Sequence, residues 1–197
     1  MVERFYNDNG FRIIITRVRL NLDGTVWDST SFVLDIIDAA LPEQELINTR
    51  WLHCDCLCEY YKTESFDEKH WEIIENYIKT AVKRGNNMIL TPIFTPPVDT
   101  AVGGERKTVQ LVGVSIDNGE YSFDFTLLDR WIELCNRLGV KYFEFSHFFT
   151  QWGAAHSPKI MAKVDGVYKK IFGWKRMLVA WSTKIFLKHL SHNCSHL

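Results

Sequence analysis

The stretch FEFSHFFTQWGAAH, residues 143–156, holds the densest group of side chains whose types could do chemistry. It begins like a buried strand and then places a carboxylate, a hydroxyl, an imidazole, an amide and an indole within nine residues: Glu144, Ser146, His147, Gln151 and Trp152. Carboxylates and imidazoles can transfer protons near neutral pH, and all five groups can form hydrogen bonds. The stretch is therefore the first candidate for a binding or catalytic site. The alternative is that Glu144 and His147 only satisfy each other or nearby loop amides.

Three strand-like segments and two helical patterns are predicted to position this stretch. The strands start near residues 51, 88 and 140, with the sequences WLHCDCLCEYY, MILT and VKYFEF. The first helix is predicted from a capping box at residues 65–68 (Ser-Phe-Asp-Glu), from apolar residues at helical spacing, and from a terminating glycine: Trp71, Ile74, Ile78, Ala81, Val82 and Gly85. The second helix is predicted from the same kind of pattern at Leu128, Trp131, Cys135, Leu138 and Gly139. Between the second strand and the second helix, Asn118-Gly119 predicts an inserted β-hairpin.

Alternating strands and helices predict an α/β fold with a parallel sheet and right-handed crossovers. In such sheets, functional groups gather at the carboxyl ends of the strands. We place His53 and Asp55 in the first strand, residues 91–99 after the second, and residues 144–152 at the end of the third. These three polar groups are therefore expected to converge on one rim.

The residues before this region predict a separate piece made of a few antiparallel strands. Residues 11–20 (FRIIITRVRL) and 31–37 (SFVLDII) are rich in β-branched side chains, and residues 21–24 between them have turn chemistry. The pattern breaks at Leu41-Pro42, so residues 42–49 are predicted to be a linker and residues 1–47 the first region of the chain.

Composition excludes several classes of protein. Hydrophobic residues make up 46% of the 197 residues, which predicts a packed core, and a net charge of −1 argues against a general nucleic-acid binder. No apolar stretch approaches the roughly 20 residues of a membrane span. The polar N-terminus lacks the apolar core of a signal peptide.

Five cysteines, three of them at Cys54, Cys56 and Cys58, favour reduced thiols in a cytoplasmic protein over a disulfide framework. On a strand, these three side chains would lie on one face at steps of about 6.7 Å. Two sulfurs on one zinc are at most about 4.6 Å apart. We therefore expect small packing residues rather than a metal site, and no cofactor.

The rim sequences resemble a known family. The patterns TPxxTPxxDTxxGxERxTVQLV (residues 91–112) and SHxFTQWGA (residues 146–154), together with WLHCDCLCEYY and IFGW, are similar to the catalytic domain of glycoside hydrolase family 123. They are most similar to its relatives grouped as domain of unknown function 4091. The resemblance runs from about Leu41 to Trp174.

The resemblance implies a TIM-type (β/α) barrel preceded by a β-sandwich. It also implies exo-hydrolysis of terminal β-linked N-acetylgalactosamine, with retention of configuration. In this substrate-assisted reaction the 2-acetamido group of the sugar attacks the anomeric carbon. An Asp steadies that group, and the adjacent Glu acts as acid and base with a raised pKa.

The sequence departs from the family at this catalytic pair. The family carries it in a motif like HxSDEP, whereas no SDE occurs here, and the only adjacent pair, Asp67-Glu68, is better explained as a helix cap. No catalytic residue is therefore assigned, and the pair is expected beyond Leu197. The matching rim residues are expected to bind the sugar: His53, Asp55, Asp99, Arg106, Glu144, His147, Gln151 and Trp152. Trp152 could stack on a sugar ring or belong to the core, and Glu105 and Arg106 could serve only to pin the long loop.

The end of the chain predicts an interruption of the family pattern. The last 32 residues, from Gly166, contain no Asp or Glu, and residues 175–197 are interpreted as an aberrant basic tail produced by a frame disruption. The alternative is a basic amphipathic helix. Residues 48–174 would then be the first three βα units of a barrel that takes about 250 residues when whole. We expect a truncated chain that is inactive alone, with a carbohydrate as ligand and possible self-association through the open barrel edge.

Two other interpretations stay open. The chain could be a non-catalytic carbohydrate- or partner-binding fragment that retains the rim. It could also be an intact small α/β enzyme that uses Glu144 with Asp55 or Asp99 as its carboxylate pair.

Overall fold

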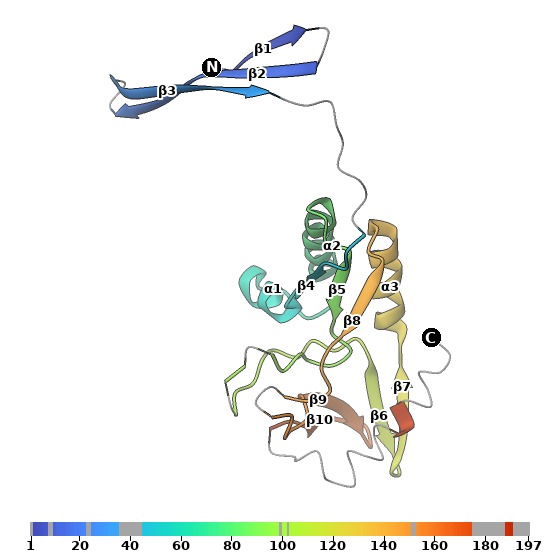
Figure 1. Cartoon of the computed structure of the whole chain (residues 1–197). Helices are drawn as coiled ribbons and strands as arrows, with labels where there is room; N and C mark the ends of the chain where they lie inside the picture. The colour runs from blue at the N-terminus through green and yellow to red at the C-terminus, as the bar shows by residue number, and fades with distance from the viewer. Residues whose placement is uncertain are drawn as a thin grey trace. The chain divides into compact units, whose positions relative to one another are not determined.

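A computed structural model describes residues 2–7, 10–22, 25–35, 45–98, 100–101, 103–150, 153–174 and 188–190 (Figure 1). The chain divides into two compact units, Met1–Glu43 and Gln44–Leu197. Three of the predicted site residues, Asp99, Gln151 and Trp152, lie outside the described residues. So does the predicted tail at 175–197, except for a helical turn at 188–190.

The first unit is a three-stranded antiparallel sheet in the order β1-β2-β3, with β1 at Val2–Asn7, β2 at Gly10–Leu22 and β3 at Thr25–Asp35. The two predicted strands are confirmed and pair as far as Leu22↔Thr25, whereas residues 23–24 of the predicted turn lie outside the described residues. The prediction missed β1, which pairs with β2 from Val2↔Ile15 to Asn7↔Gly10.

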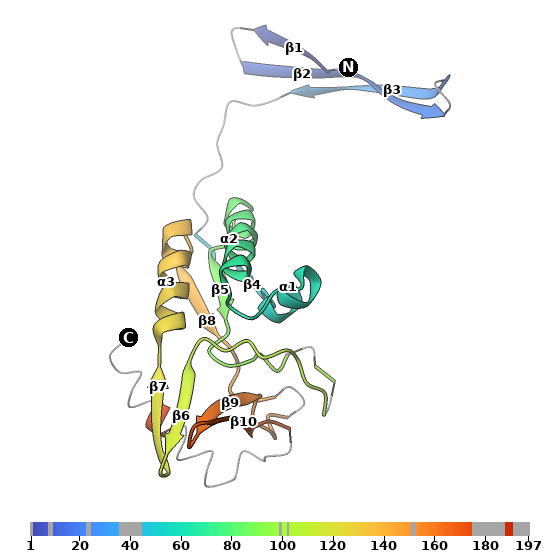
Figure 2. The ribbon, with the colours of Figure 1, turned by 180° about the vertical axis from the view of Figure 1, so that it is seen from behind.

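The second unit contains the predicted parallel sheet. Its order is β4-β5-β8, with β4 at Thr49–Arg50, β5 at Met88–Thr91 and β8 at Tyr142–Phe145. Both neighbouring pairs are parallel. Helix α2 (Glu68–Lys83) lies between β4 and β5 in the sequence, and α3 (Thr126–Leu138) precedes β8. The α/β class and the alternation of strands and helices are therefore confirmed (Figures 1 and 2).

The prediction that residues 51–61 form the first strand and its exit loop is wrong, because β4 ends at Arg50 and residues 54–61 form helix α1 (Cys54–Tyr61). The buried residues of α1 are Cys54, Asp55, Leu57 and Cys58, which are spaced as one face of a helix, whereas Cys56 is exposed. His53 is consequently the N-cap of α1, and Asp55 lies in its first turn. The argument against zinc from strand spacing no longer applies. Among the described residues, no group of three or more His, Cys, Asp or Glu side chains could hold a metal ion.

The start of α2 also differs from the prediction. The cap is Asp67 rather than Ser65: Asp67 Oδ1 accepts a hydrogen bond from the His70 backbone amide at 2.7 Å, which lowers the pKa of the Asp67 carboxyl. Ser65 Oγ instead donates to the Thr108 carbonyl oxygen at 2.8 Å, which ties the start of α2 to the long loop after β5. The predicted glycines after the two helices are confirmed, with φ of 84° at Gly85 and 94° at Gly139.

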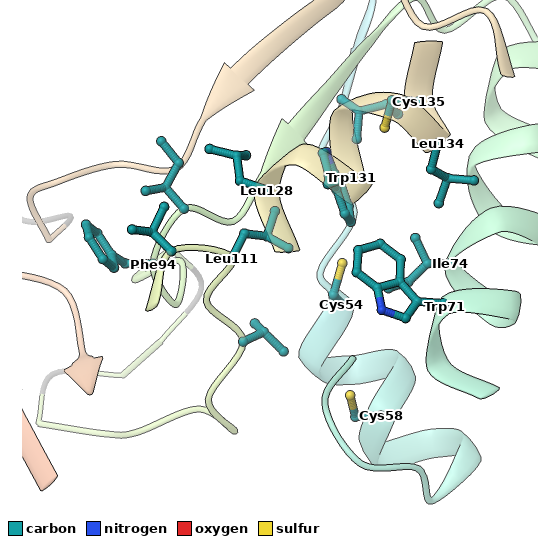
Figure 3. Close-up of a cluster of buried hydrophobic side chains, with 14 of the residues drawn as sticks. Cys54, Cys58, Trp71, Ile74, Phe94, Leu111, Leu128, Trp131, Leu134 and Cys135 are labelled. Carbon is teal, nitrogen blue, oxygen red and sulfur yellow. The ribbon is translucent and has the colours of Figure 1, made fainter. Parts of the chain in front are cut away.

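The core of the second unit lies where α2 and α3 meet the parallel sheet and the long loop (Figure 3). Trp71 of α2 and Trp131 of α3 are 3% and 0% exposed, with ring centroids 6.3 Å apart. Arg130 covers the Trp71 ring at 4.6 Å and pairs with Glu68, so a surface cation links the two helices. Ile89 of β5 belongs to the same cluster, and Phe143 of β8 packs against it.

A second sheet of the same unit has the order β10-β9-β6-β7. The predicted hairpin is confirmed: β6 (Gly113–Asp117) and β7 (Glu120–Asp124) flank Asn118 and Gly119, both with positive φ. The prediction missed β9 (Ile160–Val164) and β10 (Val167–Phe172), which are joined at Asp165-Gly166 in the same way. Strand β9 pairs in parallel with β6 through Ser115↔Lys163, so the sequence after β8 returns to the inserted hairpin.

In the part of the chain that the structure describes, no helix has the length and apolar character needed to cross a membrane.

Candidate functional site

Glu144 is the centre of a polar cluster on the parallel sheet. Its Oε2 accepts a hydrogen bond from Thr49 Oγ1 and another from Trp51 Nε1, each at 2.9 Å. Side chains alternate along a strand, so Glu144 faces away from the helical core against which its neighbour Phe143 packs. Thr49 and Glu144 lie on the two strands that flank β5, and their side chains therefore meet across the middle strand.

His147, in the loop after β8, joins this cluster through Trp51. The two rings have centroids 5.6 Å apart and meet at 76°, an edge-to-face contact. Among the described residues, Glu144 and His147 form no hydrogen bond with each other; each contacts Trp51 instead. The side chains that follow the first and third strands thus come together.

Ser146 has a different role from its neighbours. It is 2% exposed, its Oγ donates to the Phe94 carbonyl oxygen at 3.1 Å, and it accepts from the Phe94 amide at 3.3 Å. Its own amide donates to the Thr91 carbonyl oxygen at 2.9 Å. Ser146 therefore fastens the exit of β8 to the exit of β5 and holds the loop that carries His147.

Asp55 and Arg106 form a second, nearly buried cluster. Arg106 Nε donates to Asp55 Oδ2 at 2.5 Å and Arg106 Nη2 donates to Oδ1 at 3.2 Å, and the side chains are 13% and 4% exposed. Arg106 Nη1 also donates to the Val98 carbonyl oxygen at 2.9 Å, and Nη2 contacts the sulfur of Cys56 at 3.2 Å. The carboxylate of Asp55 is thus fully engaged by one guanidinium, which fixes the long loop on α1.

A cavity of about 580 Å³ adjoins this ion pair. Its lining combines residues of α1 and its cap with residues of the long loop: His53, Asp55, Cys56, Glu59, Thr100, Ala101, Gly104, Glu105 and Arg106. Three of the predicted site residues, His53, Asp55 and Arg106, therefore share one cavity wall.

Glu105 and Arg106 also pin the long loop, as the sequence suggested. Glu105 pairs with Lys170 of β10 and, at 3.7 Å, with Lys159, and the hydrogen bond from Lys170 lowers the pKa of the Glu105 carboxyl. Lys159 Nζ donates to the Arg106 carbonyl oxygen at 3.0 Å. The β9–β10 hairpin thus holds the loop from one side while α1 holds it from the other.

Cys58 and His70 form a buried pair outside the predicted site. His70 Nδ1 accepts from the Phe66 amide at 2.9 Å, so the ring proton lies on Nε2, which contacts the Cys54 carbonyl oxygen at 3.0 Å. Burial lowers the pKa of the His70 imidazole and raises the pKa of the Cys58 thiol, whose sulfur lies 3.2 Å from Nε2. The thiol therefore stays protonated near neutral pH, which suits a packing role rather than a nucleophile.

The sequence analysis missed Thr49 and Trp51 as members of the site. Both lie on the face of the sheet that carries Glu144, two residues apart, as a strand requires. The first strand was predicted to begin at Trp51, whereas β4 ends just before it. With the strand placed correctly, the alternation of Thr49 and Trp51 at its carboxyl end would have been a usable signal.

Comparisons with known proteins agree with the resemblance. The family model for the glycoside hydrolase 123 catalytic domain matches residues 51–196. The match includes residues 175–196, beyond Trp174, where the sequence analysis placed the end of the resemblance. No curated protein matches the chain.

Among solved structures, the chain is similar to a family 123 glycoside hydrolase from Clostridium perfringens, described in work on glycolipid glycan hydrolysis. The TM-score is 0.63 at 16% sequence identity, over 95% of this chain and 33% of that one. At this identity the likeness is one of fold, and the chain spans about a third of the length of that structure. Because the family model matches most of its residues, the chain belongs to the glycoside hydrolase 123 catalytic domain family.

Proposed function

We propose that this chain supplies one wall of a binding site for a terminal β-N-acetylgalactosamine-type sugar, as the first part of a glycosidase catalytic domain. In this proposal the three parallel strands are the first βα units of a TIM-type barrel, and the N-terminal sheet is the end of a β-sandwich. The observation that carries the proposal is the Glu144–Trp51–His147 cluster at the carboxyl end of the parallel sheet. Family membership and the glycolipid glycan hydrolysis reported for the similar Clostridium perfringens protein support a glycan ligand.

We assign the catalytic acid of this reaction to no residue of the chain. The only Asp-Glu pair of the sequence, Asp67-Glu68, lies at the start of helix α2. Asp67 caps the helix, and both carboxylate oxygens of Glu68 accept hydrogen bonds from Arg130 at 2.7 Å. These hydrogen bonds lower the pKa of both carboxyls, the opposite of what a general acid needs. The proposed chain therefore binds the sugar without hydrolysing it, and the substrate-assisted, retaining chemistry needs an Asp-Glu pair from outside these residues.

A small enzyme built on Glu144 and Asp55 is disfavoured. Both oxygens of Asp55 are held by Arg106, and Glu144 already accepts two hydrogen bonds from Thr49 and Trp51. Both carboxylates therefore serve hydrogen bonds within the chain: Asp55 attaches the long loop, and Glu144 holds Thr49 and Trp51. The third carboxyl in that hypothesis, Asp99, lies outside the described residues.

A second candidate is a fragment that binds a partner protein or a second copy of itself. It is favoured by an apolar cavity of about 460 Å³ between β4 and α2, lined by Trp51, Leu52, Tyr77 and Ile89 among others. Among the described strands, β4 lies at an edge of the parallel sheet, and Leu46 and Ile47 just before it are 76% and 59% exposed. Free edges beside apolar surface favour association.

The free thiols of Cys54, Cys56, Cys58 and Cys135 support the further proposal of a cytoplasmic protein.

The test is to measure binding and turnover of an aryl β-N-acetylgalactosaminide in one sample of the full chain. We expect saturable binding by calorimetry and no release of the aryl group. Aryl release that disappears in Glu144→Gln would instead support the small enzyme. Absence of sugar binding, together with a concentration-dependent oligomer in sedimentation, would favour the association candidate.

A further inference from the structure

Trp51 is an exposed aromatic side chain at the carboxyl end of the parallel sheet. It follows β4 directly and is 40% exposed, whereas Trp71 and Trp131 are 3% and 0% exposed and belong to the core. Its indole N–H is bound to Glu144, and its ring contacts His147 edge to face. The ring is thus fixed in place while much of its surface remains open.

Glu144 holds this ring rather than offering itself as a reactive group. The same oxygen, Oε2, accepts from Trp51 and from Thr49, so the indole is attached to two elements of the sheet. Two hydrogen bonds to one carboxylate oxygen restrict the side chains that donate them. None of the described residues donates to the other oxygen, Oε1, which leaves one acceptor beside the ring.

We propose that Trp51 is the platform on which the sugar stacks, and that Glu144 is the positioning residue that orients it. The inference rests on the proposed sugar-binding function and names the residue that carries it, in place of Trp152. The ligand is the galactose-configured N-acetylhexosamine already named in the proposed function. In such a ring, the axial hydroxyl at carbon 4 lies on one face, and the C–H groups at carbons 3, 4 and 5 form an apolar patch on the other.

This geometry predicts selectivity as well as affinity. The apolar patch covers an indole ring, while the hydroxyls around it reach Glu144 Oε1 and the His147 ring. In the epimer with an equatorial hydroxyl at carbon 4, the apolar patch is smaller. We therefore expect the galactose-configured sugar to bind about three- to tenfold more tightly than its epimer.

The experiment uses the full chain labelled with ¹⁵N and titrated with methyl β-N-acetylgalactosaminide, with methyl β-N-acetylglucosaminide as the matched control. Trp51→Phe identifies the indole N–H signal of Trp51 by its disappearance from the spectrum. We expect that signal to shift on sugar addition. We also expect Trp51→Ala to weaken binding at least tenfold, because an aromatic contact surface is lost.

The positioning role of Glu144 is tested by comparing the conservative substitution Glu144→Gln with Glu144→Ala. Glu144→Gln keeps a carbonyl oxygen that can accept from the indole, so its affinity should stay within about threefold of the original. Glu144→Ala releases the ring, and we expect about tenfold weaker binding together with a shift of the free Trp51 N–H signal. If Glu144 orients the ring, Glu144→Gln should retain both the sugar affinity and the position of the Trp51 N–H signal, and Glu144→Ala should lose both. A purely structural role would not link these two measurements.

The outcomes separate this inference from the proposed function. Binding that survives Trp51→Ala but is lost in Trp152→Ala would overturn the inference and leave a sugar-binding chain. Absence of binding by both sugars to the folded original chain would overturn both. Loss of binding in Trp51→Ala but not in Trp152→Ala, with the Trp51 signal shifted by sugar, would establish the inference.

Discussion

The two predicted carboxylates of the rim, Asp55 and Glu144, are used in opposite ways. Asp55 is buried against the guanidinium of Arg106, which donates to both carboxylate oxygens and so attaches the long loop to α1. Glu144 accepts hydrogen bonds from the Thr49 hydroxyl and the Trp51 indole. The Trp51 ring in turn contacts the His147 imidazole. Residue type alone would give both the same role. The partner of each carboxylate makes the difference: Asp55 lies in a buried ion pair, whereas Glu144 orients the exposed Trp51 ring on which we propose that the sugar stacks.

The largest expected effect is on stability at the Asp55 cluster. Arg106→Ala leaves a carboxylate that is 4% exposed without its cation, and we expect a loss of about 3–5 kcal/mol in the free energy of unfolding. Urea denaturation followed by circular dichroism measures it. Arg130→Ala is the control, because its pair with Glu68 is exposed and its loss should cost much less than that of the buried pair, even with the contact of Arg130 on the Trp71 ring included. Equal effects of the two substitutions would contradict the structural role of Asp55.

At Glu144 we expect a small loss of stability and a larger loss of sugar affinity. Glu144→Ala removes hydrogen bonds from two partly exposed donors, so the free energy of unfolding should fall by about 1 kcal/mol. Sugar affinity should fall about tenfold, because the ring that Glu144 orients is released. The two quantities are measured on one preparation by urea denaturation and calorimetry. A loss of several kcal/mol in stability with unchanged affinity would reverse the assignment of the two carboxylates.

A smaller effect is expected from pH at Glu105, which holds the long loop to the β9–β10 hairpin. Its pairing with Lys170 lowers the carboxyl pKa below the usual value of 4.5. The stabilisation is therefore present above that value and is lost as pH falls through the lowered pKa. Hydrogen exchange of the amides at 103–112 should accelerate more between pH 6 and about pH 3 in the original chain than in Glu105→Gln, after correction for intrinsic rates. The same pH response in both chains would show that Glu105 does not hold the loop.

The sequence predicted the parts of the fold that local chemistry controls. The helices with Trp71 and Trp131, their terminal glycines and the Asn118-Gly119 hairpin follow from periodicity and backbone preference, and they were found as expected. The segment at Cys54 failed because its cysteines alternate like a strand, while the buried set 54, 55, 57 and 58 also fits a helix face. At such short length, the contact with α2 decides between the two.

The site was predictable in outline and not in its contacts. His147 meets Trp51, the residue after β4, whereas His53 and Asp55 line a separate cavity with Arg106. The pairing of Asp55 with Arg106, 51 positions apart, depends on how the long loop folds back, and no spacing rule specifies that. The hairpin at Asp165-Gly166 carries a recognisable turn signal in the sequence, with positive φ at both residues.

The central claim is that the sugar binds at Trp51 and not beside Asp55. A crystal structure of the chain with N-acetylgalactosamine tests it most directly. The account predicts the C–H face of the sugar on the Trp51 ring, with carbon–carbon contacts of about 4 Å and a hydroxyl near Glu144 Oε1. A sugar bound instead in the cavity beside Asp55 and Arg106 would contradict it.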